Sequence, residues 1–352
     1  MRKVNMAEYG LINQYSAIAQ TNKDRYSVGR ILSQERGIYR LICETGEQLA
    51  EVSGKLRHDA KSPADFPAVG DFVFIDCNLN QGHAVIHGIF PRKSVFVRKA
   101  AGTGNTEQVI AANIDTAFIC MSLNNDFNIR RLERYLAAAW DSGATPVIVL
   151  TKSDLCSELD GYIDKVEQAA VGTDIVVTSA MSQDGYKKLL PYIQNGKTVA
   201  FIGSSGVGKS TLINRLLGEN RLETNGLRND DKGRHTTTRR ELFLLKQGGM
   251  VIDTPGMREL GLWDICDGLD KSFADIETLA TMCRFNNCSH TNEPGCAVQQ
   301  AVEKGELSKD RLKSYHKLKA ENRYAEDTEG YLSDKKQKFR NISKINKKNR
   351  ER

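Results

Sequence analysis

A nine-residue stretch near the middle of the chain has the glycine, lysine and hydroxyl pattern of a phosphate-binding loop. An apolar run at residues 199–202 predicts a buried strand before it, and residues 212–217 predict a helix after it. In that context, backbone N–H groups and the positive end of the helix can surround phosphate oxygens. Lys209 would reach the β- and γ-phosphates of a nucleotide, and the Ser210 hydroxyl would ligate Mg²⁺. A glycine-rich turn with an unrelated lysine is the alternative, which the flanking strand and helix disfavour. This phosphate loop consists of Gly203, Ser204, Ser205, Gly206, Val207, Gly208, Lys209, Ser210 and Thr211.

A second motif, earlier in the chain, predicts which base the nucleotide carries. Asp154 follows an apolar run at residues 146–150 and would lie at the carboxyl end of a strand, where open α/β sheets bind ligands. Its carboxylate can accept the ring N–H and the exocyclic amine of guanine, a donor pair that adenine lacks. The stem of Lys152 would cover the base, and a backbone N–H of the Thr178-Ser179-Ala180 triplet would contact the guanine carbonyl. Each of these short patterns alone is weak evidence for guanine binding. The predicted base-binding residues are Thr151, Lys152, Ser153, Asp154, Ser179 and Ala180.

A polar segment, residues 219–234, leads from the phosphate loop towards a histidine and three threonines. One hydroxyl among Thr236, Thr237 and Thr238 would coordinate Mg²⁺ and release it after hydrolysis, as a switch does. The sequence leaves the choice among the three open, with Thr237 as the candidate, and an ordinary surface loop is the alternative.

The sequence Asp-Thr-Pro-Gly follows the next predicted strand. Asp253 would hold Mg²⁺ through water, and the Gly256 N–H would reach the γ-phosphate. Met257 occupies the position at which Ras-like GTPases carry a glutamine that orients the attacking water, so slow intrinsic hydrolysis is expected. A partner or an inward-turned His235 would have to complete the site, although His235 is as well explained as a solvated loop residue.

Three cysteines and one histidine lie within fourteen residues near the C-terminal end. Three thiolates and one imidazole make a closed tetrahedral Zn²⁺ site with no open position, so the predicted role is structural. Reduced cysteines beside a surface histidine are the alternative. The predicted ligands are Cys283, Cys288, His290 and Cys296.

The elements that position these motifs alternate between predicted strands and helices from residue 114 to residue 253. Strands are expected at 114–121, 146–150, 174–177, 198–202, 241–245 and 250–253, with helices at 128–139, 162–169 and 186–193. The guanine motif precedes the phosphate loop, whereas ordinary GTPases have the reverse order. The domain is therefore predicted to be circularly permuted, a change that a sheet tolerates when its original ends lie close together.

The first 95 residues predict a small β-barrel. Five short strand-like runs, at 26–32, 37–43, 48–53, 71–76 and 84–90, suggest the oligonucleotide-binding type, and residues 91–93 and 99–104 suggest a connection. Five basic residues could face RNA, but a solvated face is the favoured interpretation. They are Arg30, Arg40, Lys55, Arg57 and His58.

Charge is concentrated at the C-terminal end. Residues 331–352 hold nine Lys or Arg and two acidic residues, a net of +7 against +6 for the whole chain of 352 residues. This tail is expected to be disordered when free and to seek RNA phosphate by counterion release, or else only to aid solubility. The sequence has neither a membrane-length apolar run nor a secretory signal, and we expect a cytoplasmic protein.

Taken together, these features resemble the small ribosomal subunit biogenesis GTPase family (RsgA) over about residues 26 to 325. The resemblance implies a GTPase that acts late in assembly of the small subunit, binds rRNA near the decoding region and is stimulated by the subunit. It implies one structural Zn²⁺ per chain, Mg²⁺ with GTP, and a monomer off the ribosome. A GTP-gated RNA-binding switch with incidental hydrolysis and a metabolite kinase or ATPase are the rival interpretations.

The fold class expected is multidomain α/β. The domains expected are an OB-like barrel at 1–95, a permuted GTPase domain at 96–260, a helical zinc-binding module at 261–330 and a basic tail at 331–352.

Overall fold

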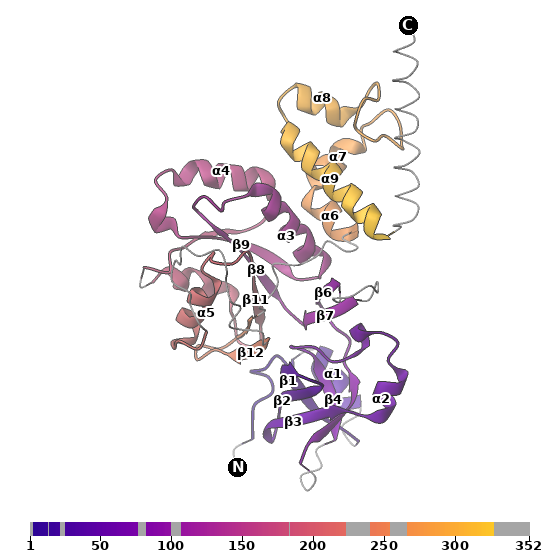
Figure 1. Cartoon of the computed structure of the whole chain (residues 1–352), viewed down its shortest axis with the longest axis vertical. Helices are drawn as coiled ribbons and strands as arrows, with labels where there is room; N and C mark the ends of the chain where they lie inside the picture. The colour runs from indigo at the N-terminus through magenta and orange to yellow at the C-terminus, as the bar shows by residue number, and fades with distance from the viewer. Residues whose placement is uncertain are drawn as a thin grey trace. The chain divides into compact units, whose positions relative to one another are not determined.

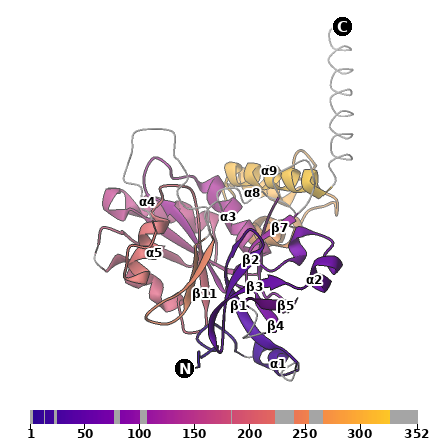
Figure 2. The ribbon, with the colours of Figure 1, turned by 60° about the horizontal axis from the view of Figure 1, so that its bottom comes forward.

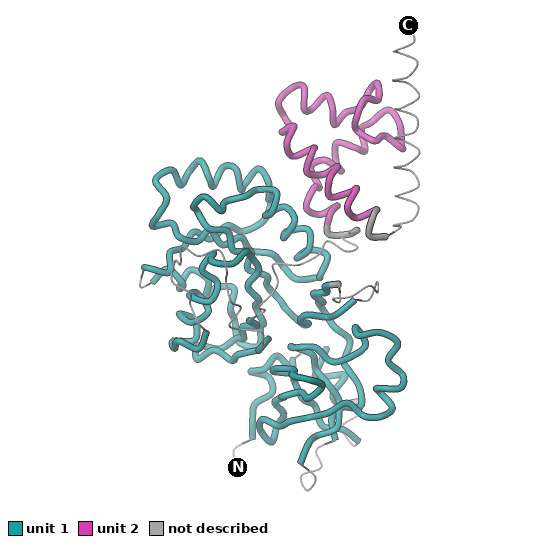
Figure 3. Tube along the Cα trace, in the orientation of Figure 1, with its two compact units in different colours: residues 1–260 teal, residues 261–352 magenta. Residues whose placement is uncertain are grey.

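The computed structural model describes residues 3–12, 14–21, 25–76, 82–99, 107–182, 184–222, 240–253 and 266–326. The chain divides into two compact units, residues 1–260 and residues 261–352, which Figure 3 draws in two colours. Each unit is described by itself.

The predicted five-stranded barrel is confirmed. Its neighbours run β1-β2-β3-β5-β4, and β1 also pairs with β4, which closes the sheet on itself. Strand alternation places one set of side chains inside, including Ile31, Leu41 and Ile75, which are fully buried. The strands are β1 (Ser27–Glu35), β2 (Ile38–Cys43), β3 (Gly46–Val52), β4 (Phe72–Asp76) and β5 (Ala84–Ile89).

Several elements around the barrel were not predicted. Helix α1 (Gln14–Thr21) lies before β1, and the short helix α2 (Gly54–Asp59) begins where the Ser53 hydroxyl accepts a hydrogen bond from the Leu56 N–H at 3.1 Å. A 3₁₀ turn, η1 (Pro63–Asp65), follows α2. Figure 2 shows α1 and α2 at different sides of the barrel.

Residues 91–93 lie outside any strand, as expected, but the sequence did not predict the hairpin that follows them. Strands β6 (Val95–Lys99) and β7 (Glu107–Ala112) pair antiparallel as a hairpin between the barrel and the next sheet. Their few residues alternate only weakly, so the turn signals at Lys99 and beyond dominated the prediction.

Six further strands follow the hairpin in the order β10-β9-β8-β11-β13-β12, and the antiparallel pairing of β12 with β1 joins them to the barrel strands in one sheet. Among these six strands, every pairing is parallel except that of β12 with β13. The carboxyl ends of β9, β10, β11 and β13 therefore meet at one edge of the sheet. The strands are β8 (Thr116–Ser122), β9 (Thr145–Thr151), β10 (Ile175–Val177), β11 (Thr198–Ile202), β12 (Glu241–Leu244) and β13 (Met250–Asp253).

Helices cover both faces of this sheet because its strands carry apolar side chains on both faces. Ile119 packs in the cluster that contains α3 (Ile129–Asp141) and α4 (Leu159–Ala169), whereas Phe118 and Phe201 pack with α5 (Lys209–Leu217). Figure 1 shows α3 and α4 on one side of the strands and α5 on the other. The helix predicted at 186–193 is a 3₁₀ helix, η3 (Gly185–Tyr192), and Pro191 inside it cannot donate a backbone hydrogen bond.

The barrel is joined to the sheet through buried polar contacts. The Arg30 side chain is fully buried, and its guanidinium donates to the Thr198 hydroxyl at 2.7 Å and to the Gly70 carbonyl at 3.3 Å. Arg40 pairs with Glu241 of β12 and with Glu47. The hypothesis that Arg30 faces RNA is therefore wrong, because its side chain is fully buried. Arg40 is partly exposed, and its charge is paired with the two glutamates.

The second unit contains α6 (Cys266–Ser272), α7 (Ala274–Ala280), α8 (Ala297–Glu303) and α9 (Lys309–Glu326). The two helices predicted at 297–304 and 309–321 are present, and α9 extends further. Tyr315 packs against Phe273 with ring centroids 5.6 Å apart, and Arg311 pairs with Asp275 at 2.7 Å. Among the described helices of both units, none is long and apolar enough to span a membrane.

Candidate nucleotide site and metal centre

The phosphate loop leaves the end of β11 through glycines in conformations that other residues avoid. Gly203, Gly206 and Gly208 have φ angles of 147°, 73° and 97°. A Cβ atom on Gly203 would lie 2.5 Å from the Cys120 carbonyl oxygen, so no side chain fits there. A Cβ on Gly206 or Gly208 would meet no atom within 4 Å. The loop thus packs tightly against β8 at its start and leaves an open space at its two later glycines.

The Lys209 ammonium group lies against this loop. Its ammonium donates to the carbonyl oxygens of Gly203, at 2.7 Å, and Ser204, at 2.5 Å. Helix α5 begins at Lys209, three residues earlier than predicted, so Ser210 and Thr211 stand in its first turn. Backbone N–H groups at a helix start are unpaired within the helix and can face an anion.

Asp253 ends β13, the strand beside β11, where Ala200 pairs with Ile252. Burial raises the pKa of the Asp253 carboxyl to about 6; the nearby Lys209 opposes this rise and Glu241 adds to it. A divalent cation would restore the charged form, and hydroxyl and carboxylate oxygens are the ligands that Mg²⁺ prefers. The donor set of Asp253 and Ser210 therefore fits that ion.

The predicted base-binding residues lie at the ends of β9 and β10. Lys152 adopts a left-handed conformation with φ of 57°, which turns the chain into the one-turn helix η2 (Ser153–Leu155). The Ser179 hydroxyl donates to the exposed carboxylate of Asp154, and the Ser153 N–H donates to the Thr178 carbonyl at 3.3 Å. Ala180 follows and is partly exposed. These bonds hold Asp154 in a fixed orientation at the sheet edge.

A direct contact links the two loops. The buried Thr151 hydroxyl donates to the Val207 carbonyl of the phosphate loop at 2.6 Å, with the Met121 carbonyl further away at 3.4 Å. The sequence assigned Thr151 to base binding but gave no sign of this contact, because the two residues are 56 positions apart.

Three predicted catalytic residues, His235, Thr237 and Gly256, lie outside the described residues. Thr236, Thr238 and Met257 do so as well.

The four predicted metal ligands come together in the second unit, with all their ligand atoms within 4.8 Å of one another. The His290 Nδ1 lies 3.5 Å from the Sγ atoms of both Cys283 and Cys296, and those two Sγ atoms are 3.9 Å apart. This separation is far beyond the roughly 2.05 Å of a disulfide. A Cys₃His set at this spacing fits a tetrahedral metal ion such as Zn²⁺.

Polar residues beside the cluster, which the sequence did not predict, help to hold its ligands in place. Gln299 of α8 donates to the His290 carbonyl at 2.6 Å, which helps to hold His290 in its left-handed conformation with φ of 55°. The Glu293 carboxylate accepts bonds from Ser289 and from the Thr291 N–H, and these lower the pKa of Glu293 to about 2. In the sequence, the close spacing of Ser, Thr and Glu is the signal for a loop whose side chains bond to its own backbone.

Comparison with known proteins gives matches along most of the chain. A family model described as RsgA GTPase matches residues 89–263, and one described as 50S ribosome-binding GTPase matches residues 198–347. The chain is 52% identical over 322 residues to the small ribosomal subunit biogenesis GTPase RsgA 2 of Lactiplantibacillus plantarum, covering 91% of this chain and 90% of that protein.

Two solved structures share the fold. YjeQ from Thermotoga maritima is 28% identical, covers 83% of this chain and 96% of its own, and has a TM-score of 0.63. YloQ, described as a circularly permuted GTPase, is 27% identical, covers 83% and 93%, and has a TM-score of 0.59. Together with the observed strand order, these matches confirm the predicted permuted fold.

Proposed function

Because the chain belongs to the RsgA family of small ribosomal subunit biogenesis GTPases, we propose that it acts late in the assembly of that subunit. Its reaction is the hydrolysis of GTP. It binds rRNA near the decoding region, and the subunit stimulates its hydrolysis. It works in the cytoplasm and is a monomer when it is off the ribosome.

One contact supports guanine-nucleotide binding most directly. The bond from Thr151 to Val207 fixes the loop that carries Asp154 against the loop that carries Lys209. A base at one end of a nucleotide and phosphates at the other can then engage both loops at once. The carboxyl ends of all the parallel strands share this edge, so it is the direct bond between the two loops that supports a joint role.

The residues of the phosphate end have separate roles. With a nucleotide bound, Lys209 would exchange its bonds to its own loop for contacts with phosphate oxygens. Ser210 would ligate Mg²⁺ directly, and Asp253 would hold the ion through water. When bound, the ion neutralises charge on the β- and γ-phosphate oxygens. Thr237 and Gly256 report the γ-phosphate. His235 or a group of the ribosome completes the site, because Met257 cannot orient water as a glutamine does.

The metal centre of the second unit holds one Zn²⁺. Its ligand set is closed, so the ion stabilises the module rather than taking part in hydrolysis. A small module gains much of its folding free energy from such an ion. The basic tail adds affinity for rRNA phosphate.

Co-sedimentation with small ribosomal subunits tests this function. We expect the chain to pellet with the subunits in a non-hydrolysable GTP analogue and to remain largely in the supernatant with GDP. Large subunits are the control. Equal pelleting with both nucleotides, or a preference for the large subunit, would contradict the proposal.

Met257 favours a second candidate, a GTP-gated RNA-binding switch in which turnover is incidental. The two functions differ in one measurement, the rate of GTP hydrolysis with and without small subunits. The assembly GTPase predicts stimulation by the subunit, whereas the switch predicts the same slow rate in both cases.

A further inference from the structure

A row of polar residues crosses the sheet from the barrel to the nucleotide edge. Ser33 of β1 lies directly opposite Arg40 of β2 on one side and directly opposite Glu241 of β12 on the other. Glu241 in turn lies directly opposite Asp253 of β13. Because opposite residues on paired strands point to the same face, all four side chains share one face of the sheet. The row therefore joins a barrel residue to the carboxylate predicted to hold Mg²⁺.

This face of the sheet is the one that α5 covers. Phe243, two residues after Glu241, packs in the same apolar cluster as Leu212 of α5. Residues two positions apart on a strand point to the same side. Glu241 and Asp253 thus lie on the side of the sheet where α5 begins with Lys209, and the charges of both Lys209 and Glu241 act on the Asp253 carboxyl.

The Arg40 guanidinium spans the middle of the row. Its Nε donates to the Ser33 hydroxyl at 3.3 Å, its Nη2 pairs with Glu241, and its Nη1 pairs with Glu47 at 3.3 Å. The Arg40 and Glu241 side chains are 34% and 23% exposed, so water screens this pair only in part. A carboxylate at this depth that lost its cation would keep an uncompensated charge.

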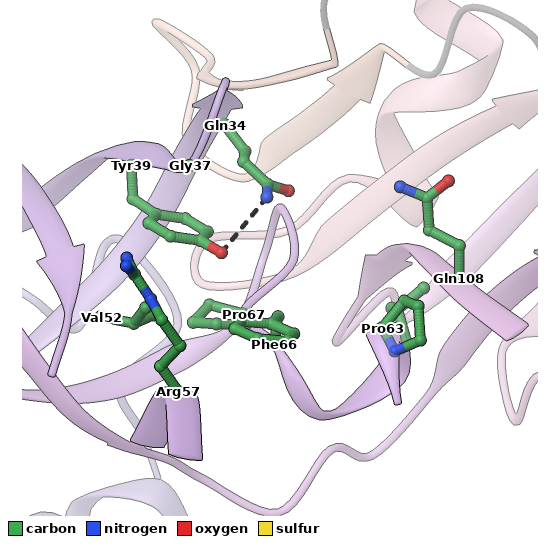
Figure 4. Close-up of a pocket in the computed structure, with 10 residues that line it drawn as sticks. Gln34, Gly37, Tyr39, Val52, Arg57, Pro63, Phe66, Pro67 and Gln108 are labelled. Atoms are coloured by element: carbon green, nitrogen blue, oxygen red, sulfur yellow. Dashed lines mark hydrogen bonds between the residues drawn. The ribbon is translucent and has the colours of Figure 1, made fainter. Parts of the chain in front are cut away.

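Neighbouring contacts fix the strands on which Ser33 and Arg40 stand. Gln34 and Tyr39, the next residues of β1 and β2, are also opposite one another, and the Gln34 amide donates to the Tyr39 hydroxyl at 3.2 Å. Figure 4 shows this bond at the edge of a pocket that β7 completes with Gln108. The Tyr39 ring is buried in the barrel core, so the register at the row is held by packing as well as by hydrogen bonds.

A carboxylate directly opposite Asp253 has a physical cost unless its charge is balanced. Like charges that face one another on neighbouring strands repel. Mg²⁺ bound with a nucleotide takes one or two carboxylates besides phosphate oxygens, so an unpaired Glu241 could join Asp253 at the ion. It would also add negative charge beside the phosphates. Paired with Arg40, the Glu241 carboxylate is balanced and held towards the barrel.

We infer that Arg40 of the barrel is a positioning residue of the nucleotide site: by holding Glu241, it keeps that carboxylate from joining Asp253 at the Mg²⁺ position. The inference rests on the Mg²⁺ role proposed above for Asp253. An ion pair that merely fastens the barrel to the sheet is the alternative, and the two differ in the sign of their effects on metal binding.

Mn²⁺ binding to the full-length chain in its GDP complex tests the inference. Mn²⁺ takes the same oxygen ligands as Mg²⁺, and electron paramagnetic resonance measures the ion that remains free. Arg40→Met frees Glu241, so we expect Mn²⁺ to bind at least about fivefold more tightly, since affinity rises with the number of carboxylate charges. Glu241→Gln leaves the guanidinium without this partner, and Mn²⁺ should bind more weakly because the uncompensated cation repels it.

The double variant, Arg40→Met with Glu241→Gln, separates the inference from a structural ion pair. It removes both charges, so Mn²⁺ affinity should return to within about twofold of the parent value. A pair that only fastens the barrel predicts that both single variants change the affinity in the same direction. Arg40→Met that binds Mn²⁺ no more tightly than the parent would overturn the inference, as would a double variant that keeps the tighter binding.

Lys197→Met is the matched control for Arg40→Met, because each removes one positive charge. Lys197 pairs with Asp115 at 3.1 Å and stands just before β11, at the end of the strand away from the phosphate loop. Its loss should leave Mn²⁺ affinity within about twofold of the parent. Tightening equal to that of Arg40→Met would show an effect of net charge alone and overturn the role of Arg40.

Failure of the assigned nucleotide site gives a different result from failure of this inference. If the parent chain with GDP binds no more Mn²⁺ than GDP alone, the Mg²⁺ roles of Ser210 and Asp253 are wrong. If the parent chain binds the ion and only the response to Arg40→Met is missing, the role of Arg40 alone is wrong.

Discussion

The hydroxyl of Thr151 donates a 2.6 Å hydrogen bond to the carbonyl oxygen of Val207, and both residues are buried. Through this bond the loop that would read the base and the loop that would hold the phosphates have one fixed spacing. A nucleotide that spans both loops depends on that spacing, so the contact matters for affinity although it touches no ligand.

Thr151→Val removes the hydroxyl and leaves the Val207 carbonyl without this partner. An unpaired buried carbonyl costs about 1 to 3 kcal/mol of folding free energy, so we expect a lower melting temperature. Because the two nucleotide loops are then no longer bonded to each other, we also expect GTP affinity to fall. Isothermal titration with GDP and GTP measures this change. Ser142→Ala is the control, because the buried Ser142 hydroxyl bonds to the Ala139 carbonyl far from the nucleotide loops. A similar loss of affinity in both variants would show only general destabilisation.

Asp154→Asn tests the choice of base. The amide can no longer accept two guanine donors, but its NH₂ can donate to the carbonyl that xanthine carries in place of the exocyclic amine. We expect GTP affinity to fall by at least tenfold, since bonds to charged groups contribute about 1.5 to 3 kcal/mol, and XTP affinity to rise. Competition binding with GTP, XTP and ATP measures both. ATP that competes equally with GTP in the parent chain would refute the assignment of this motif.

Asp253→Asn is expected to stabilise the nucleotide-free chain. Burial raises the pKa of Asp253 from 3.8 to about 6, so between these values the folded state binds more protons than the unfolded state. Stability contributed by the neutral carboxyl is therefore full below about pH 4 and is lost as the pH rises to about 6. At pH 7.5 the charged carboxylate lowers the free energy of unfolding by at most about 3 kcal/mol, and by less after allowance for its partial exposure.

Thermal melts without nucleotide or Mg²⁺ measure this effect. The melting temperature of Asp253→Asn should exceed that of the parent at pH 7.5 and match it below about pH 4, while GTP hydrolysis at pH 7.5 is lost. Asp174→Asn, an exposed aspartate at the start of β10, is a control that should show no such dependence. Equal melting temperatures at pH 7.5 would mean that the charged carboxylate is not penalised.

Cys288→Ser should release the metal and unfold the second unit. The other three ligands cannot complete a tetrahedral site, and the module loses the folding free energy of the ion. Metal analysis by mass spectrometry should find one zinc per parent chain and much less in the variant, with GTP binding unchanged within about twofold. Cys156→Ser, outside the cluster, is the control. Zinc-free parent protein, freshly purified without chelators, would contradict the assignment.

Removal of residues 335–352 tests the basic tail. Fewer cations release fewer counterions on binding, so RNA affinity should fall and its dependence on salt should flatten. Anisotropy titrations at 50, 100 and 200 mM salt give the slope. An unchanged slope would leave the tail only a role in solubility.

The sequence by itself determined the local elements and the chemistry they carry. Each of the recognised patterns constrains structure over a few residues: the glycines with a lysine after an apolar run, the alternating strands and helices, and the three cysteines beside a histidine. The predicted barrel, sheet and ligand cluster agree with the fold. It could not show that Arg30 is buried against Thr198, that Thr151 bonds to Val207, or that β7 completes a pocket with the barrel. These contacts join residues 56 to 168 positions apart or depend on packing between elements, and no local pattern encodes which distant surfaces meet. Periodicity decides which face of an element is apolar, whereas burial and hydrogen bonding between elements are decided only when the whole chain is packed.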